Sequence, residues 1–246
     1  MSESRGDGPI EITYEFRFAD GSVRKHEIRI DATTLELLGT DEPSPPPWTA
    51  LEFRQCSNCP LKPDTHPRCP VAANLSSVAE KFKNAVSVER AEIHVHSVER
   101  SYYKETTMQH GLQSVFGLIM ATSGCPHMNF LKPLAKFHLP FATYEETVVR
   151  ALSMHLLRNY FLAQNGRVVS LDIKQLDNNY IEVAVVNRGI AERIRQLGGK
   201  DADKNAIVIL DSFAKLLRMD MSDNRLELEA IFVDRLSAPP GAVEPT

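Results

Sequence analysis

The segment from residue 55 to residue 72, QCSNCPLKPDTHPRCPVA, constrains the fold more than any other part of the chain. It contains three of the four cysteines and four prolines, Pro60, Pro63, Pro67 and Pro70. Proline lacks the backbone N–H and clashes with a preceding helical turn, so the segment can form neither a regular helix nor a central strand. We therefore expect an irregular loop over 55–72 that needs some other interaction to order it.

The rest of the chain suggests a cytoplasmic protein. The N-terminus lacks the apolar stretch of a signal peptide, and no apolar run approaches the roughly 20 residues of a membrane span. The net charge of -4 and the absence of a long basic run argue against binding to nucleic acid or to a membrane. Thiols stay reduced in the cytoplasm, so closely spaced cysteines there are more often metal ligands or redox groups than disulfides.

The cysteines fit one ligand set. Their spacing is C-x2-C-x9-C followed by a distant fourth thiol: Cys56, Cys59, Cys69 and Cys125. Four thiolates can bind either a structural zinc ion or a 4Fe–4S iron–sulfur cluster. Structural zinc sites usually use two paired knuckles, whereas this chain has one, and the cysteine–proline pairs are typical of cluster motifs. The pattern therefore favours a 4Fe–4S cluster, with zinc as the alternative, and His66 or His127 could replace one thiolate.

A second unusual stretch lies just after Cys125. In MNFLKPLAKFHLPF, three basic side chains, Lys132, Lys136 and His138, alternate with apolar residues. One interpretation is an anion or partner site beside the metal. The other is a loop that packs its apolar residues and leaves its lysines in solvent.

Strand patterns come first along the chain. Residues 10–18 and 23–30 alternate apolar and polar residues around an Asp-Gly turn, which predicts a β-hairpin. Residues 88–105 alternate again and should extend this hairpin by one or two strands, after a short helix over 73–86. The N-terminal 1–105 therefore reads as β-rich.

Helical patterns fill the C-terminal part, 106–236. They cover 106–124, a helix after Thr143 with a capping box to Glu146, and the ranges 171–197, 203–218 and 224–236. Residues 237–246 are expected to be a disordered tail. Strands first and helices after predict one integrated α+β domain, with a small antiparallel sheet and a helical C-terminal half.

The chain also resembles a family of uncharacterised bacterial proteins. The matching elements are CSNCPL, THPRCP, TSGCPH and KPLAKFHLPF, together with the hairpin before them and the helices after them. The resemblance spans nearly the whole chain. It implies a bacterial cytosolic protein and carries no catalytic residue with it.

Three functions are compatible with these residues. The first is a metal-binding, iron–sulfur protein with a structural, electron-transfer or redox-sensing role. The second is a zinc-stabilised, non-enzymatic module that binds a protein partner through its helical half. The third is a metalloenzyme that combines the cysteine site with His127, Lys132 and His138.

Overall fold

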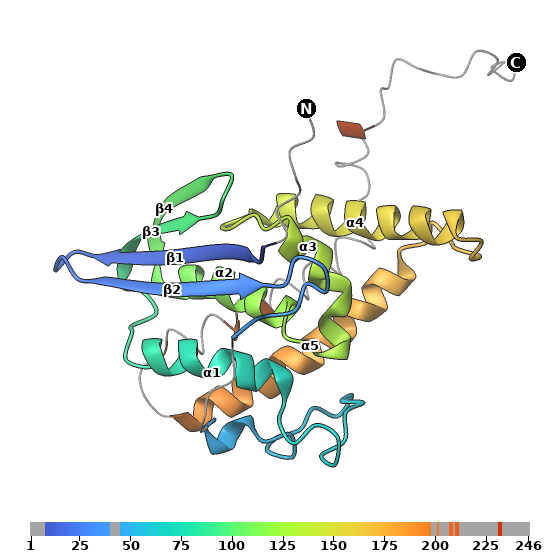
Figure 1. Ribbon diagram of the computed structural model, residues 1–246. Coiled ribbons are helices and arrows are strands. Elements are labelled where there is room, and N and C mark those ends of the chain that lie inside the picture. The colour runs from blue at the N-terminus through green and yellow to red at the C-terminus, as the bar shows by residue number, and fades with distance from the viewer. Residues whose placement is uncertain are drawn as a thin grey trace, which may run out of the picture.

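A computed structural model describes residues 8–39, 45–197, 201, 207, 208, 210, 211, 231 and 232. The described elements follow the order β1, β2, η1, α1, β3, β4, α2, η2, α3, α4, α5 and η3 (Figure 1). The α+β prediction is confirmed, because an N-terminal antiparallel sheet precedes a mainly helical second half.

The sheet contains the predicted hairpin, β1 (Ile10–Phe18) and β2 (Val23–Ile30), at the expected bounds. Its strand order is β2-β1-β3-β4, so β3 (Arg90–His96) pairs with β1 and β4 (Ser101–Thr107) lies at the edge. All three pairings are antiparallel. The hairpin is thus extended on its β1 side, as the alternation over 88–105 indicated.

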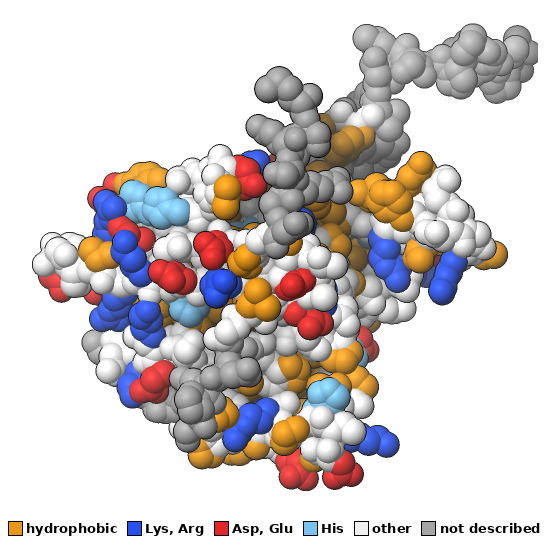
Figure 2. Space-filling view, in the orientation of Figure 1, with side chains coloured by type: hydrophobic (Ala, Val, Ile, Leu, Met, Phe, Trp, Pro, Cys, Tyr) orange, Lys and Arg blue, Asp and Glu red, His pale blue; other side chains and the backbone are white. Residues whose placement is uncertain are grey.

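One face of the sheet is apolar and covered by helices. Tyr14, Phe16 and Ile93 are fully buried on it, as expected for alternate residues of a strand. Helix α2 (Met108–Ala121) lies so close to the sheet that a Cβ added to Gly111 would stand 2.2 Å from Ile93 Cδ1. The opposite face is polar, and Figure 2 shows Lys, Arg, Asp and Glu side chains over the β1–β2 hairpin.

The first helix begins inside the segment predicted to be irregular. Helix α1 covers Pro70–Phe82, and Pro70 occupies its first turn, where the missing N–H has no helical partner to lose. The loop before it contains a short helical turn, η1 (Pro47–Thr49), and an isolated bridge between Ala50 and Arg68. The loop therefore ends at Cys69, the N-cap of α1.

The second half consists of long helices joined by short ones. After α2 come η2 (Pro126–Leu131), α3 (Lys132–Lys136), α4 (Tyr144–Gln164), α5 (Lys174–Ile194) and η3 (Arg195–Leu197). The predicted capping box between Thr143 and Glu146 is present at the start of α4. In Figure 1, α5 runs diagonally from near the end of α4 to the lower left, above the loop that precedes α1.

Two expectations fall largely outside the described residues. Most of the ranges 203–218 and 224–236, where helices were predicted, and the whole tail 237–246 are not described. Among the helices that are described, none combines the length and apolar character needed to cross a membrane.

Candidate functional site

The cysteine loop packs against α5 through a single glycine. Cys56 and Cys59 form a turn in which the Cys59 N–H donates to the Cys56 carbonyl oxygen at 3.0 Å. A Cβ added to Gly189, in the middle of α5, would lie 2.6 Å from Cys56 Sγ. Only a glycine at this position leaves room for the Cys56 sulfur where it stands.

Cys69 stands at the start of α1. Its backbone N–H donates to the Thr49 carbonyl oxygen at 2.8 Å, which ties the end of the loop to η1. The thiol makes no capping hydrogen bond, but the backbone N–H groups of Val71 and Ala72, in the first turn of the helix, lower its pKa against the larger effect of burial. These N–H groups have no partner inside the helix, so they would stabilise a thiolate at the N-cap.

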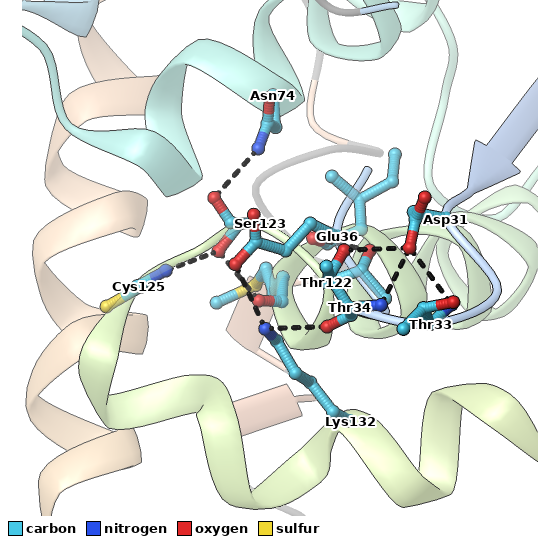
Figure 3. A network of polar contacts seen from close by, with 11 residues as sticks. Asp31, Thr33, Thr34, Glu36, Asn74, Thr122, Ser123, Cys125 and Lys132 are labelled. Atoms are coloured by element: carbon cyan, nitrogen blue, oxygen red, sulfur yellow. Dashed lines mark hydrogen bonds and ion pairs between the residues drawn. The ribbon is translucent and has the colours of Figure 1, made fainter. Parts of the chain in front are cut away.

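Cys125 repeats this arrangement at the start of η2. It is the N-cap, Pro126 follows it, and the backbone N–H of His127 lowers the pKa of its thiol without forming a capping hydrogen bond. Its own N–H donates to Ser123 Oγ at 3.3 Å, while Asn74 of α1 donates to the Ser123 carbonyl oxygen at 3.1 Å. Figure 3 shows these contacts at the edge of a polar network from which the Cys125 sulfur points away.

The four thiols are close enough to influence one another electrostatically. Burial raises the pKa of Cys56 to about 11, and the neighbouring Cys69 and Cys59 thiols add to the rise. Burial likewise raises the pKa of Cys125 to about 12, with contributions from the other three cysteines. Folding therefore brings Cys125 near the thiols of the loop, and the assignment of all four as ligands of one metal group stays a prediction.

These raised pKa values limit what the free thiols can do. A thiol with a pKa near 11 or 12 is almost entirely protonated at neutral pH, and the thiolate is the reactive nucleophile. Binding to a metal cation would remove the protons and reverse this effect, because coordination stabilises the thiolate. The environment of Cys56 and Cys125 is thus unfavourable for nucleophilic catalysis and compatible with metal ligation.

A buried arginine adjoins the thiols. Arg193, at the end of α5, is 1% exposed and donates to the backbone carbonyl oxygens of Trp48, Ala50 and Leu51 at 2.7 to 2.9 Å. Its positive charge lowers the pKa values of Cys56 and Cys69, against the larger effect of burial. The buried Nε of Arg193 has no hydrogen-bond partner among the described residues. The Nε–H of Arg193 could therefore donate a further hydrogen bond, and the positive charge of the guanidinium would offset the negative charge of nearby thiolates.

His127 ties η2 to the cysteine loop and to α5. Its Nε2 donates to the Asn58 carbonyl oxygen at 2.7 Å, and its Nδ1 lies 3.8 Å from Glu182 Oε2. The Asn58 amide in turn donates to Glu182 Oε2 at 2.7 Å. The other alternate ligand, His66, is exposed, and its Nδ1 lies 3.0 Å from Thr65 Oγ1. Both histidines are therefore occupied by other contacts in this conformation.

Which metal group the four thiols could hold depends on how far apart their sulfur atoms lie. Over the part of the chain that the structure describes, no three Cys, His, Asp or Glu side chains gather as ligands of one ion. Zinc thiolates require an ion about 2.3 Å from every sulfur, and hence sulfurs in near contact. A 4Fe–4S cluster keeps its four thiolates further apart, because iron and sulfide ions lie between them.

The three basic residues after Cys125 do not form one site. Lys132 Nζ donates to the Thr34 carbonyl oxygen at 3.1 Å and to Glu36 Oε1 at 3.2 Å (Figure 3). Lys136 Nζ donates to the Ala32 carbonyl oxygen at 3.4 Å. Both lysines therefore hold the turn after β2. His138 lies apart from them, with its Nε2 2.5 Å from the Tyr14 hydroxyl.

Sequence reasoning missed the contributions of α5 to this site. Gly189 interrupts an otherwise well-formed helix, at a cost of about 1 kcal/mol relative to alanine, which signals a close approach. Arg193 lies on a helical face with Val186 and Ile190, and an arginine among apolar residues signals a buried charge. Neither signal identifies the cysteine loop as the contact, because the loop is more than 120 residues away in sequence.

The sequence of the chain matches a family model. No curated protein matches the chain, and no solved structure matches it. The family model, described as a domain of unknown function, matches residues 12–233, which include every cysteine and all the described strands and helices except the first two residues of β1. The chain therefore belongs to the family designated Domain of unknown function (DUF6901).

Proposed function

We propose that this protein binds a 4Fe–4S cluster through Cys56, Cys59, Cys69 and Cys125 and uses it for electron transfer or redox sensing. The observation that carries the proposal is the proximity of the four thiols, since Cys69, Cys56 and Cys59 all contribute to the raised pKa of Cys125. Two of them are N-caps whose thiol pKa values are lowered by nearby backbone N–H groups, and one fits against α5 only because residue 189 is glycine.

The charge around the thiols supports this choice of cofactor. A 4Fe–4S cluster with four thiolates carries a net negative charge, and hydrogen bonds to its sulfurs tune its potential. Arg193 supplies a buried cation and an unused Nε donor at this place.

The burial of the four cysteines suggests how the cluster would work. Cys69 and Cys125 are each 8% exposed, whereas Cys56 and Cys59 are partly exposed. A cluster held between them would be anchored in the core on one side and approachable from solvent on the other. It would also order the proline-rich loop, since its ligands join the loop to α1 and η2.

The test is anaerobic purification of the full chain, followed by iron, sulfide and zinc analysis and visible absorption spectroscopy. We expect about four iron and four sulfide ions per chain and absorption toward the blue end of the visible range. Cys69→Ser should lower the iron content and the melting temperature. In chelator-treated, metal-free protein, the melting difference between Cys69→Ser and wild type should largely disappear.

His66→Ala is the matched control, because His66 lies in the same loop and has the chemistry of a ligand. It should leave iron and sulfide unchanged. If the protein contains about one zinc ion per chain and no sulfide, the iron–sulfur proposal is wrong. The zinc-stabilised module would then be the supported function. Neither metal in gently purified protein would refute the proposal.

A further inference from the structure

A cavity of about 440 Å³ lies on the other side of α5, between α2, the η2–α3 segment and α4. Its volume is in the range of small-molecule sites. Tyr180, Val183 and Asn187 of α5 line it, whereas Glu182, Gly189 and Arg193 face the cysteine loop or its thiols. At 100° per residue these two sets are centred about 130° apart around the helix. The cavity is therefore a separate site.

The walls of the cavity are mostly apolar, with side chains such as Leu118, Met128 and Leu134. Arg150 of α4 and Lys104 of β4 bring positive charge to it. None of the described residues that line it is Asp or Glu. The nearest carboxylate in sequence to the guanidinium, Glu146, accepts the Thr143 N–H at 2.7 Å in the capping box of α4.

Arg150 has hydrogen-bonding capacity left. Its Nη2 donates to the carbonyl oxygens of Leu134 at 3.1 Å and Phe137 at 2.7 Å, which fixes the guanidinium against α3. Its Nη1 and Nε make no hydrogen bond to any described residue, so they are available to a ligand. A half-buried cation with free donors in an apolar cavity favours a molecule that carries one negative charge.

Two further polar groups of the wall are held in place from the core. The hydroxyl of Tyr14, which is fully buried, lies 2.8 Å from Ser114 Oγ and 2.5 Å from His138 Nε2. Burial lowers the pKa of His138 to about 4, so this histidine is neutral at physiological pH. It offers hydrogen bonding without adding charge, and Arg150 remains the main anion-binding group.

We propose that this cavity binds a small organic carboxylate with an apolar body. The carboxylate would be bound by Arg150, and the apolar body would lie among the side chains of α2, η2 and α3. One guanidinium and apolar walls suit a monocarboxylate, whereas a phosphate dianion usually requires several N–H groups at a helix start or glycine-rich loop. The inference does not depend on the metal site.

Octanoate is the probe, titrated into the full chain as purified by isothermal calorimetry. Octan-1-ol has the same apolar body without the charge, and acetate has the charge without the body. We expect octanoate to bind at least about tenfold more tightly than either, since a hydrogen-bonded charge contributes about 1.5–3 kcal/mol. Octanol binding as tightly as octanoate, or no octanoate binding, would overturn the proposal.

Two variants locate the binding. Arg150→Gln should weaken octanoate binding at least about tenfold and leave octanol binding unchanged. Arg158→Gln, on the exposed side of the same helix, is the matched control and should change neither. Unchanged octanoate binding to Arg150→Gln would overturn the assignment.

Gly117→Leu tests the cavity without touching the charge, in case Arg150→Gln does not fold. A Cβ at Gly117 meets only Leu210 Cδ2, at 3.5 Å, so the helix can accept a side chain that then projects into the cavity. This variant should abolish octanoate binding while it retains the wild-type melting temperature or exceeds it. Full octanoate binding to it would place the ligand elsewhere and refute the proposal.

Discussion

Gly189→Ala tests the packing of the cysteine loop against α5. In a free helix this change stabilises by about 1 kcal/mol, because alanine has the higher helix propensity. Here the new methyl would stand 2.6 Å from Cys56 Sγ, a separation that carbon and sulfur cannot hold, so the sulfur or the loop must move. Overpacking of this kind costs about 1–3 kcal/mol. We expect a net loss of up to about 2 kcal/mol in the free energy of unfolding.

The assay is urea denaturation of metal-free, reduced protein in a double-mutant cycle with Cys56→Ala. The Cys56 Cβ would lie 3.8 Å from the new methyl, which is an ordinary contact. In the Cys56→Ala background, Gly189→Ala should therefore stabilise by about 1 kcal/mol, giving a coupling energy of about 1–3 kcal/mol. Gly117→Ala is the matched control and should stabilise with or without Cys56.

Gly189→Ala is also expected to change the metal content of the protein. If Cys56 rotates to avoid the methyl, its sulfur leaves the other thiols, and Gly189→Ala should purify with less iron than wild type. If Gly189→Ala stabilises wild-type protein as much as Gly117→Ala does, the close packing is refuted. Normal iron content in a destabilised variant would show that Cys56 is not a ligand.

Two further predictions concern buried charge and pH. Arg193→Met leaves the carbonyl oxygens of Trp48, Ala50 and Leu51 without their donor, so urea denaturation should show a loss of about 2–4 kcal/mol. An unchanged midpoint would mean that water replaces the guanidinium. Burial lowers the pKa of His138 to about 4 in the folded protein, whereas the unfolded value is 6.5. The contribution of the neutral histidine to the free energy of unfolding is therefore complete above pH 6.5 and declines as pH falls toward 4. His138→Gln should flatten the decrease in melting temperature between pH 6.5 and pH 4, and an identical pH profile would contradict this account.

Local sequence determined the secondary structure well, because the relevant forces act between neighbours. The alternation around Asp20-Gly21 fixed the hairpin at its observed bounds, and the pair Thr143 and Glu146 marked the start of α4. The same local reasoning misjudged Pro70, which begins a helix, since proline disrupts a helix only after its first turn.

The sequence also predicted that the four cysteines form one ligand set, because three lie in one proline-rich loop and the fourth is the only other thiol in the chain. Only the tertiary structure decided what surrounds them. How α5 and η2 pack against the loop decides the roles of Gly189 and Arg193 and the hydrogen bond from His127 to the Asn58 carbonyl oxygen. Tertiary packing also separates His138 from the two lysines. The placement of β3 beside β1 and the cavity behind α5 were decided in the same way. These contacts join residues far apart in the chain, so their geometry is set by the packing of whole elements, which no local pattern encodes.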